Sequence, residues 1–250
     1  MKTKSSRKRL DVLLVERGLA ESRQRALAMI LAGEVQVDGQ RASAAGAAVA
    51  SDSRIALNSR AQKFASRGGL KLEGALDDFG IVATSRICLD IGSSTGGFTD
   101  CLLQRGAARV YAVDVNIAQL AWGLQQDTRV LRIERNAREL RRADIAELVD
   151  LVVIDVSFIS VTKVLAPAID CARDEADILV LVKPQFELPR AEVGEGGIVS
   201  DRFLHEKAIA QVREAGEQAR LHWLGLRPSK LTGAEGNQEY FLRARKKGQE

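Results

Sequence analysis

From residue 87 onward, short apolar runs alternate with segments that have helical periodicity. Four runs are almost continuously apolar: 87–91, 110–113, 151–154 and 178–182. Three segments are predicted to be helical: 70–76, 98–103 and 201–218. Continuous apolar runs are typical of strands buried in a parallel sheet, and their alternation with helices indicates an open α/β fold.

The N-terminal part of the chain has a different pattern. A first helix is predicted over 9–17, closed by a glycine, and Ser22 is placed to cap a second helix over 23–31. Residues 34–39 then alternate apolar and polar positions and end in Asp-Gly, a turn typical of β-hairpins. The alanine-rich segment 42–50 is predicted to be a loop. The pattern favours a small α+β module.

We therefore expect two domains joined by a polar, basic linker. The small domain is predicted at 1–58, the linker at 59–69 and the α/β domain at 70–250. The chain has 250 residues, of which 46% are hydrophobic, so it is long enough to bury the core of a full α/β domain beside a small module.

The composition excludes several classes of protein. No apolar run approaches the roughly 18 residues of a membrane span, and the basic N-terminus lacks the apolar segment of a secretory signal. The three cysteines form no C-x-x-C pair. We expect them to be reduced, in a cytoplasmic protein with no metal site and no membrane contact.

Charge is distributed unevenly along the chain. Residues 1–71 contain 14 Lys and Arg against 6 Asp and Glu, whereas the remainder contains 23 against 27. A basic module on a mildly acidic body favours a polyanionic partner, and nucleic acid is the expected one. The candidate RNA-binding residues are Lys8, Arg9, Arg17, Arg23, Arg25 and Arg67.

A glycine-rich turn at 92–97 follows the first apolar run of the α/β domain. Asp114 ends the next run, 22 positions after Gly92, where nucleotide-binding folds place the acid that holds ribose hydroxyls. The turn fits neither G-x-G-x-x-G nor a P-loop. It does fit the G-x-S-x-G elbow of serine hydrolases, with Ser94 as nucleophile. That alternative would combine Ser94 with Asp155 and either His205 or His222.

Two further polar residues come directly after buried strands. Asp155 follows the run 151–154, and Lys183 follows 178–182. Because ligands of open α/β sheets bind at the carboxyl ends of the strands, these side chains should share a crevice with the glycine-rich turn. A partly buried lysine there could act as a base near neutral pH. Lys71 begins a predicted helix, where a cation is slightly unfavourable, which hints at a role.

The motifs that surround these residues resemble a known family. The relevant segments are 66–72 (SRGGLKL), 92–100 (GSSTGGFTD), 155–160 (DVSFIS), 183–187 (KPQFE) and 236–240 (GNQEY). They resemble the TlyA branch of the FtsJ-like RNA ribose 2′-O-methyltransferases. Residues 8–57 are similar to the S-four RNA-binding fold, which the TlyA branch joins to its methyltransferase domain. The linker residues Arg60-Ala61-Gln62-Lys63 depart from the Arg-x-Trp-Val form of some members.

This resemblance implies a Rossmann-like, seven-stranded S-adenosylmethionine-dependent methyltransferase sheet behind a small S-four domain. It implies S-adenosylmethionine as methyl donor and a cytidine ribose of 16S or 23S ribosomal RNA, alone or in ribosomal subunits, as acceptor. The catalytic set carried over from the family is Lys71, Asp155, Lys183 and Glu239. The expected cofactor-binding residues are Asp90, Gly92, Ser94, Thr95, Gly96, Gly97, Phe98, Asp114, Asn136 and Asp155.

The resemblance also implies roles for these residues. The segment 92–98 would face the methionine part of the donor, Asp114 its ribose and Asn136 its adenine. For the mechanism we hypothesise that Lys183 deprotonates or orients the 2′-hydroxyl and that Asp155 holds Lys183. Lys71 with Glu239 would position the ribose and balance charge. Besides the serine hydrolase, two alternatives remain at this point: an RNA-binding protein with an inactive methyltransferase domain, and a haemolysin, the name that some family members carry.

Overall fold

The computed structural model describes residues 7–20, 22–31, 35–42, 44, 46–57, 63–233 and 235–248. The chain divides into two compact units, Met1–Gln62 and Lys63–Glu250. Residues 59–62 of the predicted linker, where the sequence departs from the Arg-x-Trp-Val form, lie outside the described residues. Residues 63–69 belong to the second unit, because Phe64 is buried in its core and a helix begins at Gly68.

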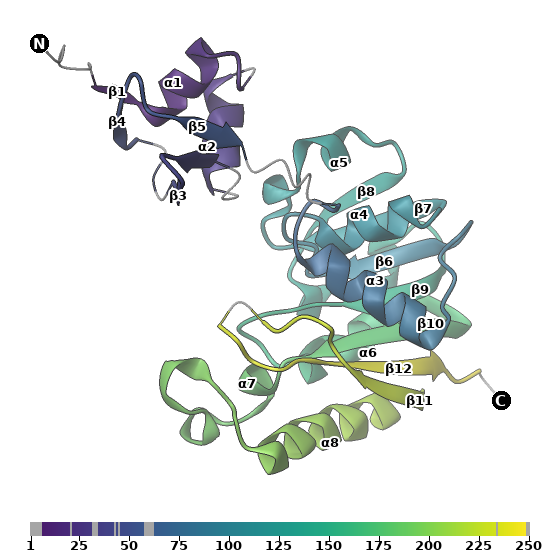
Figure 1. Cartoon of the computed structure of the whole chain (residues 1–250). Helices are drawn as coiled ribbons and strands as arrows, with labels where there is room; N and C mark the ends of the chain where they lie inside the picture. Colours follow the sequence, from purple (N-terminus) through teal and green to yellow (C-terminus); the bar gives the residue numbers. More distant parts are fainter. Residues whose placement is uncertain are drawn as a thin grey trace, which may run out of the picture. The chain divides into compact units, whose positions relative to one another are not determined.

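The first unit packs two helices against short strands (Figure 1). The helices are α1 (Leu10–Glu16) and α2 (Arg23–Leu31). The strands are β1 (Arg7–Arg9), β2 (Val35–Val37), β3 (Gln40–Arg41), β4 (Ala48–Ala50) and β5 (Ile55–Leu57). Strand β2 lies between β3 and β5, and β1 pairs antiparallel with β4.

Two sequence predictions for this unit need correction at their boundaries. The predicted loop at 42–50 contains β4, which is held by backbone pairing with β1 and not by any pattern of its own. Arg9 is the last residue of β1 and not the start of the helix, because its extended backbone pairs with Ala48. Ser22 does accept a hydrogen bond from the Arg25 backbone N–H at the start of α2, as predicted for a capping residue.

The second unit is built on a seven-stranded sheet in the order β11-β12-β10-β9-β6-β7-β8. The parallel strands are β6 (Ile87–Ile91), β7 (Arg109–Asp114), β8 (Val130–Glu134), β9 (Val149–Ile154) and β10 (Ala172–Val182). Strand β12 (Tyr240–Lys246) is antiparallel to β10, and β11 (Leu221–Pro228) is antiparallel to β12. The predicted α/β class with a small α+β unit in front is confirmed.

Helices cover both faces of this sheet (Figure 1). One face packs against α3 (Gly68–Phe79), α4 (Gly97–Gln104) and α5 (Trp122–Gln126). The other packs against α6 (Thr162–Asp170) and α8 (Arg202–Gln218), while α7 (Pro184–Glu187) is a single turn after β10. On β9, Val152 faces the second core and Val153 the first, and both are fully buried. Successive residues of this stretch are both apolar because each face of the sheet is covered by a core.

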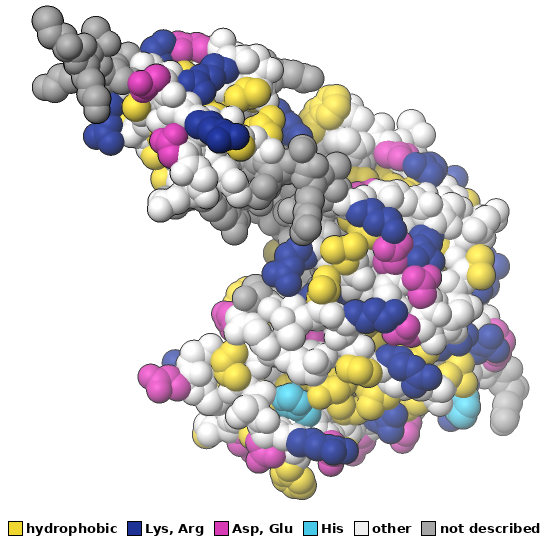
Figure 2. All heavy atoms as spheres, in the orientation of Figure 1, with side chains coloured by type: hydrophobic (Ala, Val, Ile, Leu, Met, Phe, Trp, Pro, Cys, Tyr) yellow, Lys and Arg dark blue, Asp and Glu magenta, His cyan; other side chains and the backbone are white. Residues whose placement is uncertain are grey.

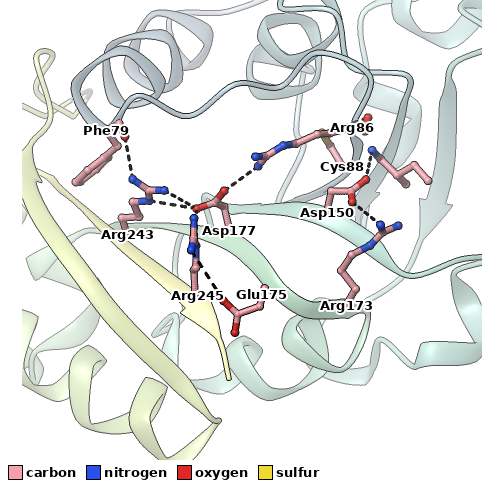
Figure 3. Close-up of polar contacts among 10 residues, drawn as sticks. Phe79, Arg86, Cys88, Asp150, Arg173, Glu175, Asp177, Arg243 and Arg245 are labelled. Carbon is pink, nitrogen blue, oxygen red and sulfur yellow. Dashed lines mark hydrogen bonds and ion pairs between the residues drawn. The ribbon is translucent and has the colours of Figure 1, made fainter. Parts of the chain in front are cut away.

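A buried ion-pair cluster joins three elements of this unit near the start of the apolar part of β10 (Figure 3). Asp177 accepts hydrogen bonds from Arg86 at 2.8 Å and from Arg243 at 2.8 and 3.2 Å. Arg243 also donates to the carbonyl oxygen of Phe79, the last residue of α3. Although burial raises the pKa of Asp177, the two arginines bring it below its ordinary value. The cluster ties α3 to β10 and β12.

Charged side chains on α3 and in the segments that flank α3 and α4 form ion pairs with each other. Figure 2 shows basic and acidic side chains interspersed there. Glu73 pairs with Lys63 and Arg105, and Arg105 also pairs with Asp77. These basic residues are therefore already matched by acidic neighbours.

Candidate active site

The polar residues predicted at strand ends meet at one edge of the sheet. The glycine-rich turn follows β6, Asp114 ends β7, Asp155 follows β9 and Lys183 follows β10. Two cavities open there, of about 240 and 410 Å³, and both are lined by Gly92, Ser94, Asp155 and Ser157. Asp155 and Lys183 thus share this edge with the glycine-rich turn, as predicted from their positions at strand ends.

Lys183 is the central cation of this edge. Its side chain is almost entirely buried and forms an ion pair with Asp155. It also donates a hydrogen bond of 2.8 Å to Ser157 Oγ, a partner that the sequence patterns did not single out. An ammonium group has three donors, so these two contacts leave one N–H of Lys183 for a ligand in the cavity.

Lys71 and Glu239 form a second buried ion pair. Lys71 Nζ lies 2.5 Å from Glu239 Oε2, although the residues are 168 positions apart. The Lys71 side chain is 12% exposed and that of Glu239 only 3%. Lys71 comes from the first turn of α3, and Glu239 immediately precedes β12. Both Lys71 and Lys183 line the smaller cavity, so two paired lysines face the same space.

Asp114 fixes the glycine-rich turn from the neighbouring strand. Its Oδ2 accepts a 2.9 Å hydrogen bond from the backbone N–H of Ser94, and its Oδ1 accepts one from Asn116. Asp114 and Asn136 both line the larger cavity. Phe98 and Gly97 line the smaller one. Thr95 contributes its carbonyl oxygen, which accepts a hydrogen bond from Ala121 N–H.

Asp90 lies beneath the turn and is completely buried. Its Oδ2 accepts a 2.6 Å hydrogen bond from Thr99 Oγ1, whereas Oδ1 has no hydrogen-bond partner among the described residues. Ser93 Oγ is unpartnered in the same sense. Burial raises the pKa of Asp90 to about 7, although the Thr99 hydroxyl opposes the shift. A buried acceptor of this kind is suited to accept a hydrogen bond from a cationic or N–H group of a ligand.

The loops after β9 and β10 are joined by contacts that sequence reasoning missed. Glu187 accepts hydrogen bonds from Ser160 Oγ at 2.5 Å and from Val161 N–H at 2.9 Å. Burial raises the pKa of Glu187. Since Glu187 follows β10 and Ser160 follows β9, this carboxylate fixes one loop against the other. The motifs KPQFE and DVSFIS contained these residues, but their periodicity did not reveal that they touch.

Phe158 is the most exposed large apolar side chain of this edge. It is 91% exposed, lines the larger cavity, and its ring centroid lies 5.3 Å from that of Phe186. Its φ of 64° is unusual for an aromatic residue. Such strain is retained mainly at functional sites.

The candidate RNA-binding residues have different environments. Arg9 and Arg23 both bond to Asp11, Lys8 pairs with Glu16, and the Arg25 side chain is exposed. Arg17 donates to the carbonyl oxygens of Ser51 and Ser53, which gives it a structural role in the first unit. Arg67, in the second unit, lines the smaller cavity beside Lys71.

The serine-hydrolase alternative lacks its histidine. The ring nitrogens of His205 lie 2.8 Å from the Tyr240 hydroxyl and 2.7 Å from the Val199 carbonyl oxygen. His222 lies on β11, opposite Arg245 of β12, and not at the cavity edge. Ser94 therefore has no imidazole base in contact.

Residues 64–246 match the FtsJ-like methyltransferase family, and residues 8–55 match the S4 domain. The chain is thus an FtsJ-like methyltransferase preceded by an S4 domain, with the predicted S-adenosylmethionine-dependent methyltransferase fold. More narrowly, it belongs to the TlyA family. It is 47% identical over 238 residues to the 16S/23S rRNA (cytidine-2'-O)-methyltransferase TlyA of Mycobacterium tuberculosis, covering 94% of this chain and 89% of that protein.

Other relatives carry a different name. The chain is 41% identical to Hemolysin A of Brachyspira hyodysenteriae, covering 93% of this chain and 98% of that one. A solved structure from Streptococcus thermophilus, also named for a hemolysin, is 38% identical with a TM-score of 0.75, covering 97% of this chain and 90% of that one. Within the part of the chain that the structure describes, no helix combines the length and apolar character needed to cross a membrane.

Proposed function

We propose that this protein transfers the methyl group of S-adenosylmethionine to the ribose 2′-oxygen of a cytidine in ribosomal RNA. The activity named for the M. tuberculosis relative supports a cytidine of ribosomal RNA as acceptor and its 2′-oxygen as the position methylated. The observation that carries the proposal is the pairing of Lys183 with Asp155 and of Lys71 with Glu239 where two cavities meet. The basic S4 domain supports an RNA substrate. Because its three cysteines are free and buried, we propose the cytoplasm as the compartment.

The donor fits the larger cavity and the turn beside it. Asp114 would hold the ribose hydroxyls, and Asn136 would face the adenine. Asp90 Oδ1 beneath the turn and Ser93 Oγ within it are buried and have no hydrogen-bond partner among the described residues, so they suit the amino group of the methionine part. S-adenosylmethionine supplies an electrophilic methyl group. The smaller cavity, with Lys71, Lys183 and Arg67, would take the acceptor nucleotide.

Methyl transfer to an oxygen needs the oxygen lone pair in line with the breaking S–C bond. The free N–H of Lys183 would orient the 2′-oxygen, while Asp155 and Ser157 hold the ammonium group in place. As the new C–O bond formed and the S–C bond broke, S-adenosylhomocysteine would leave, and the acidified hydroxyl proton would pass to the Asp155 carboxylate while Lys183 stays protonated. An ion-paired lysine favours oxygen orientation over direct deprotonation. Lys71 and Glu239 would position the ribose and balance its charge.

The exposed Phe158 ring supports a single-stranded or unstacked RNA substrate. Sequence-specific RNA recognition commonly stacks splayed bases on aromatic side chains. Phe158 presents such an exposed surface beside the larger cavity, and its ring contacts that of Phe186.

The proposal is tested by incubating the purified chain with methyl-labelled S-adenosylmethionine and three acceptors: naked ribosomal RNA, isolated subunits and whole ribosomes. We expect label in RNA with at least one acceptor. No incorporation, together with no S-adenosylmethionine binding by calorimetry, would favour an RNA-binding protein with an inactive domain. Lysis of erythrocytes by the purified protein would favour the haemolysin function instead.

Replacing Asp90 by asparagine should change the pH dependence of stability. Because the pKa of Asp90 is raised in the folded protein to about 7, its stabilising contribution is present at low pH and is lost as pH rises through that value. Between about pH 5 and pH 8 the unfolding free energy of the unaltered protein, without S-adenosylmethionine, should fall by about 2–3 kcal/mol relative to Asp90→Asn. Urea denaturation of both proteins measures this. A pH-independent difference would show that Asp90 does not titrate in this range.

Lys71→Ala and Glu239→Gln should each lower methylation by about 10-fold to 100-fold. Their effects should be strongly non-additive, because each residue is the buried partner of the other. The double variant should therefore lose little more activity than the worse single variant. Turnover of all three under saturating S-adenosylmethionine measures the coupling, and additive losses would mean that the two residues act separately.

A further inference from the structure

Asp11 is a buried carboxylate at the start of α1 in the first unit, only 4% exposed. It accepts hydrogen bonds from Arg9 Nε and Nη2 and from Arg23 Nη2, each at 3.0 Å. The backbone N–H of Val12 donates a further 3.0 Å hydrogen bond to it. Arg9 ends β1 and Arg23 begins α2, so one carboxylate gathers two arginines from separate elements.

The arginines themselves remain accessible. The side chains of Arg9 and Arg23 are 56% and 62% exposed, whereas that of Asp11 is 6% exposed. A guanidinium group has five N–H donors in a rigid fork, and Asp11 occupies only part of each fork. The hydrogen bond from Arg9 and then that from Arg23 keep the pKa of Asp11 well below its usual range despite its burial. The carboxylate is therefore charged whenever the protein is folded near neutral pH.

We propose that Asp11 is a positioning residue that presents Arg9 and Arg23 together as a preorganised site for RNA backbone phosphates, without touching the RNA itself. The inference rests on the proposed function, which makes RNA the partner of this unit. Two arginines fixed at one place lose less side-chain freedom when they bind adjacent phosphate oxygens. Arg17 differs, since its guanidinium is bound to the backbone of Ser51 and Ser53.

The direction in which one substitution changes RNA affinity separates positioning from simple electrostatics. Asp11→Asn removes a negative charge from a basic surface, so long-range attraction alone predicts tighter RNA binding. Positioning predicts the opposite, because the asparagine amide holds the two guanidinium groups more weakly. We expect Asp11→Asn in the full chain to bind ribosomal RNA about 5-fold to 20-fold more weakly than the unaltered protein.

A matched control removes the same charge from an exposed pair. Glu16 bonds to Lys8 at 2.6 Å, with its side chain 45% exposed. Glu16→Gln should bind RNA as tightly as the unaltered chain or more tightly. In a background with Arg9→Ala and Arg23→Ala, the change Asp11→Asn should cause no further weakening.

Filter binding of transcribed 16S and 23S ribosomal RNA at two salt concentrations measures these affinities, and thermal melting reports folding. If Asp11→Asn unfolds the first unit, Asp11→Glu takes its place: it keeps the charge but moves it, and positioning again predicts weaker binding. Wild-type or tighter binding by a folded Asp11 variant would overturn the inference while leaving the methyltransferase proposal intact. Failure of the unaltered chain to bind ribosomal RNA would overturn both.

Discussion

Lys183→Ala should lower methyl transfer by about 100-fold to 10,000-fold, because the 2′-oxygen would lose the donor that orients it and Asp155 would lose the partner that holds it in place. Lys183 contacts both Asp155 and Ser157, and all three residues line the smaller cavity. Binding of S-adenosylmethionine should change by only a few fold, because Asp114 and the glycine-rich turn are untouched. Single-turnover methylation and calorimetry separate the two effects.

The control is an exposed lysine of the same domain that does not line either cavity. Lys163 on α6 is exposed, and Lys163→Ala should leave methylation unchanged. Near-normal methylation by a folded Lys183→Ala protein would contradict the role given to Lys183.

Gly92→Ala should abolish the binding of S-adenosylmethionine and destabilise the protein by about 2–5 kcal/mol. A Cβ at this position would lie 2.2 Å from the carbonyl oxygen of Asp155, and the backbone has a φ of +82°. Both the turn and the loop after β9 would have to move, and these are the segments that the two cavities share. Calorimetry and urea denaturation measure the two losses.

Gly123 offers the same substitution without the clash. A Cβ at Gly123 would meet nothing within 4 Å, and its φ is not in the left-handed region. Gly123→Ala should therefore be close to neutral in both measurements. If Gly92→Ala behaves like Gly123→Ala, S-adenosylmethionine binding does not require the close approach of the Gly92 backbone to the carbonyl oxygen of Asp155.

The sequence predicted the edge of the sheet well, because each strand end carried its own signal. Asp155 and Lys183 follow continuous apolar runs, and parallel strands must place such residues together. The pairing of Lys71 with Glu239 had no such signal, since it joins the first turn of a helix to a residue 168 positions later. Only the resemblance to a family grouped these two with the other residues.

Other features depended on tertiary contacts that periodicity does not record. Strand β8 alternates buried and more exposed residues, so its sequence is a weaker strand signal than the apolar runs of the central strands. The position of β8 in the sheet follows from its pairing with β7. The polar start of β10, including Arg173 and Glu175, extends the strand beyond the predicted 178–182. The basic charge of the first unit was visible in composition, but composition did not distinguish Arg17, bound to backbone, from Arg9 and Arg23.

The two cavities would place the methyl group of S-adenosylmethionine beside the ribose 2′-oxygen of a cytidine. Mass spectrometry of nucleosides from ribosomal RNA that the purified protein has methylated is the decisive measurement. We expect 2′-O-methylcytidine, and its formation should depend on Lys183. Methylation of a base or of another ribose position, or RNA that gains no methyl group, would contradict this function.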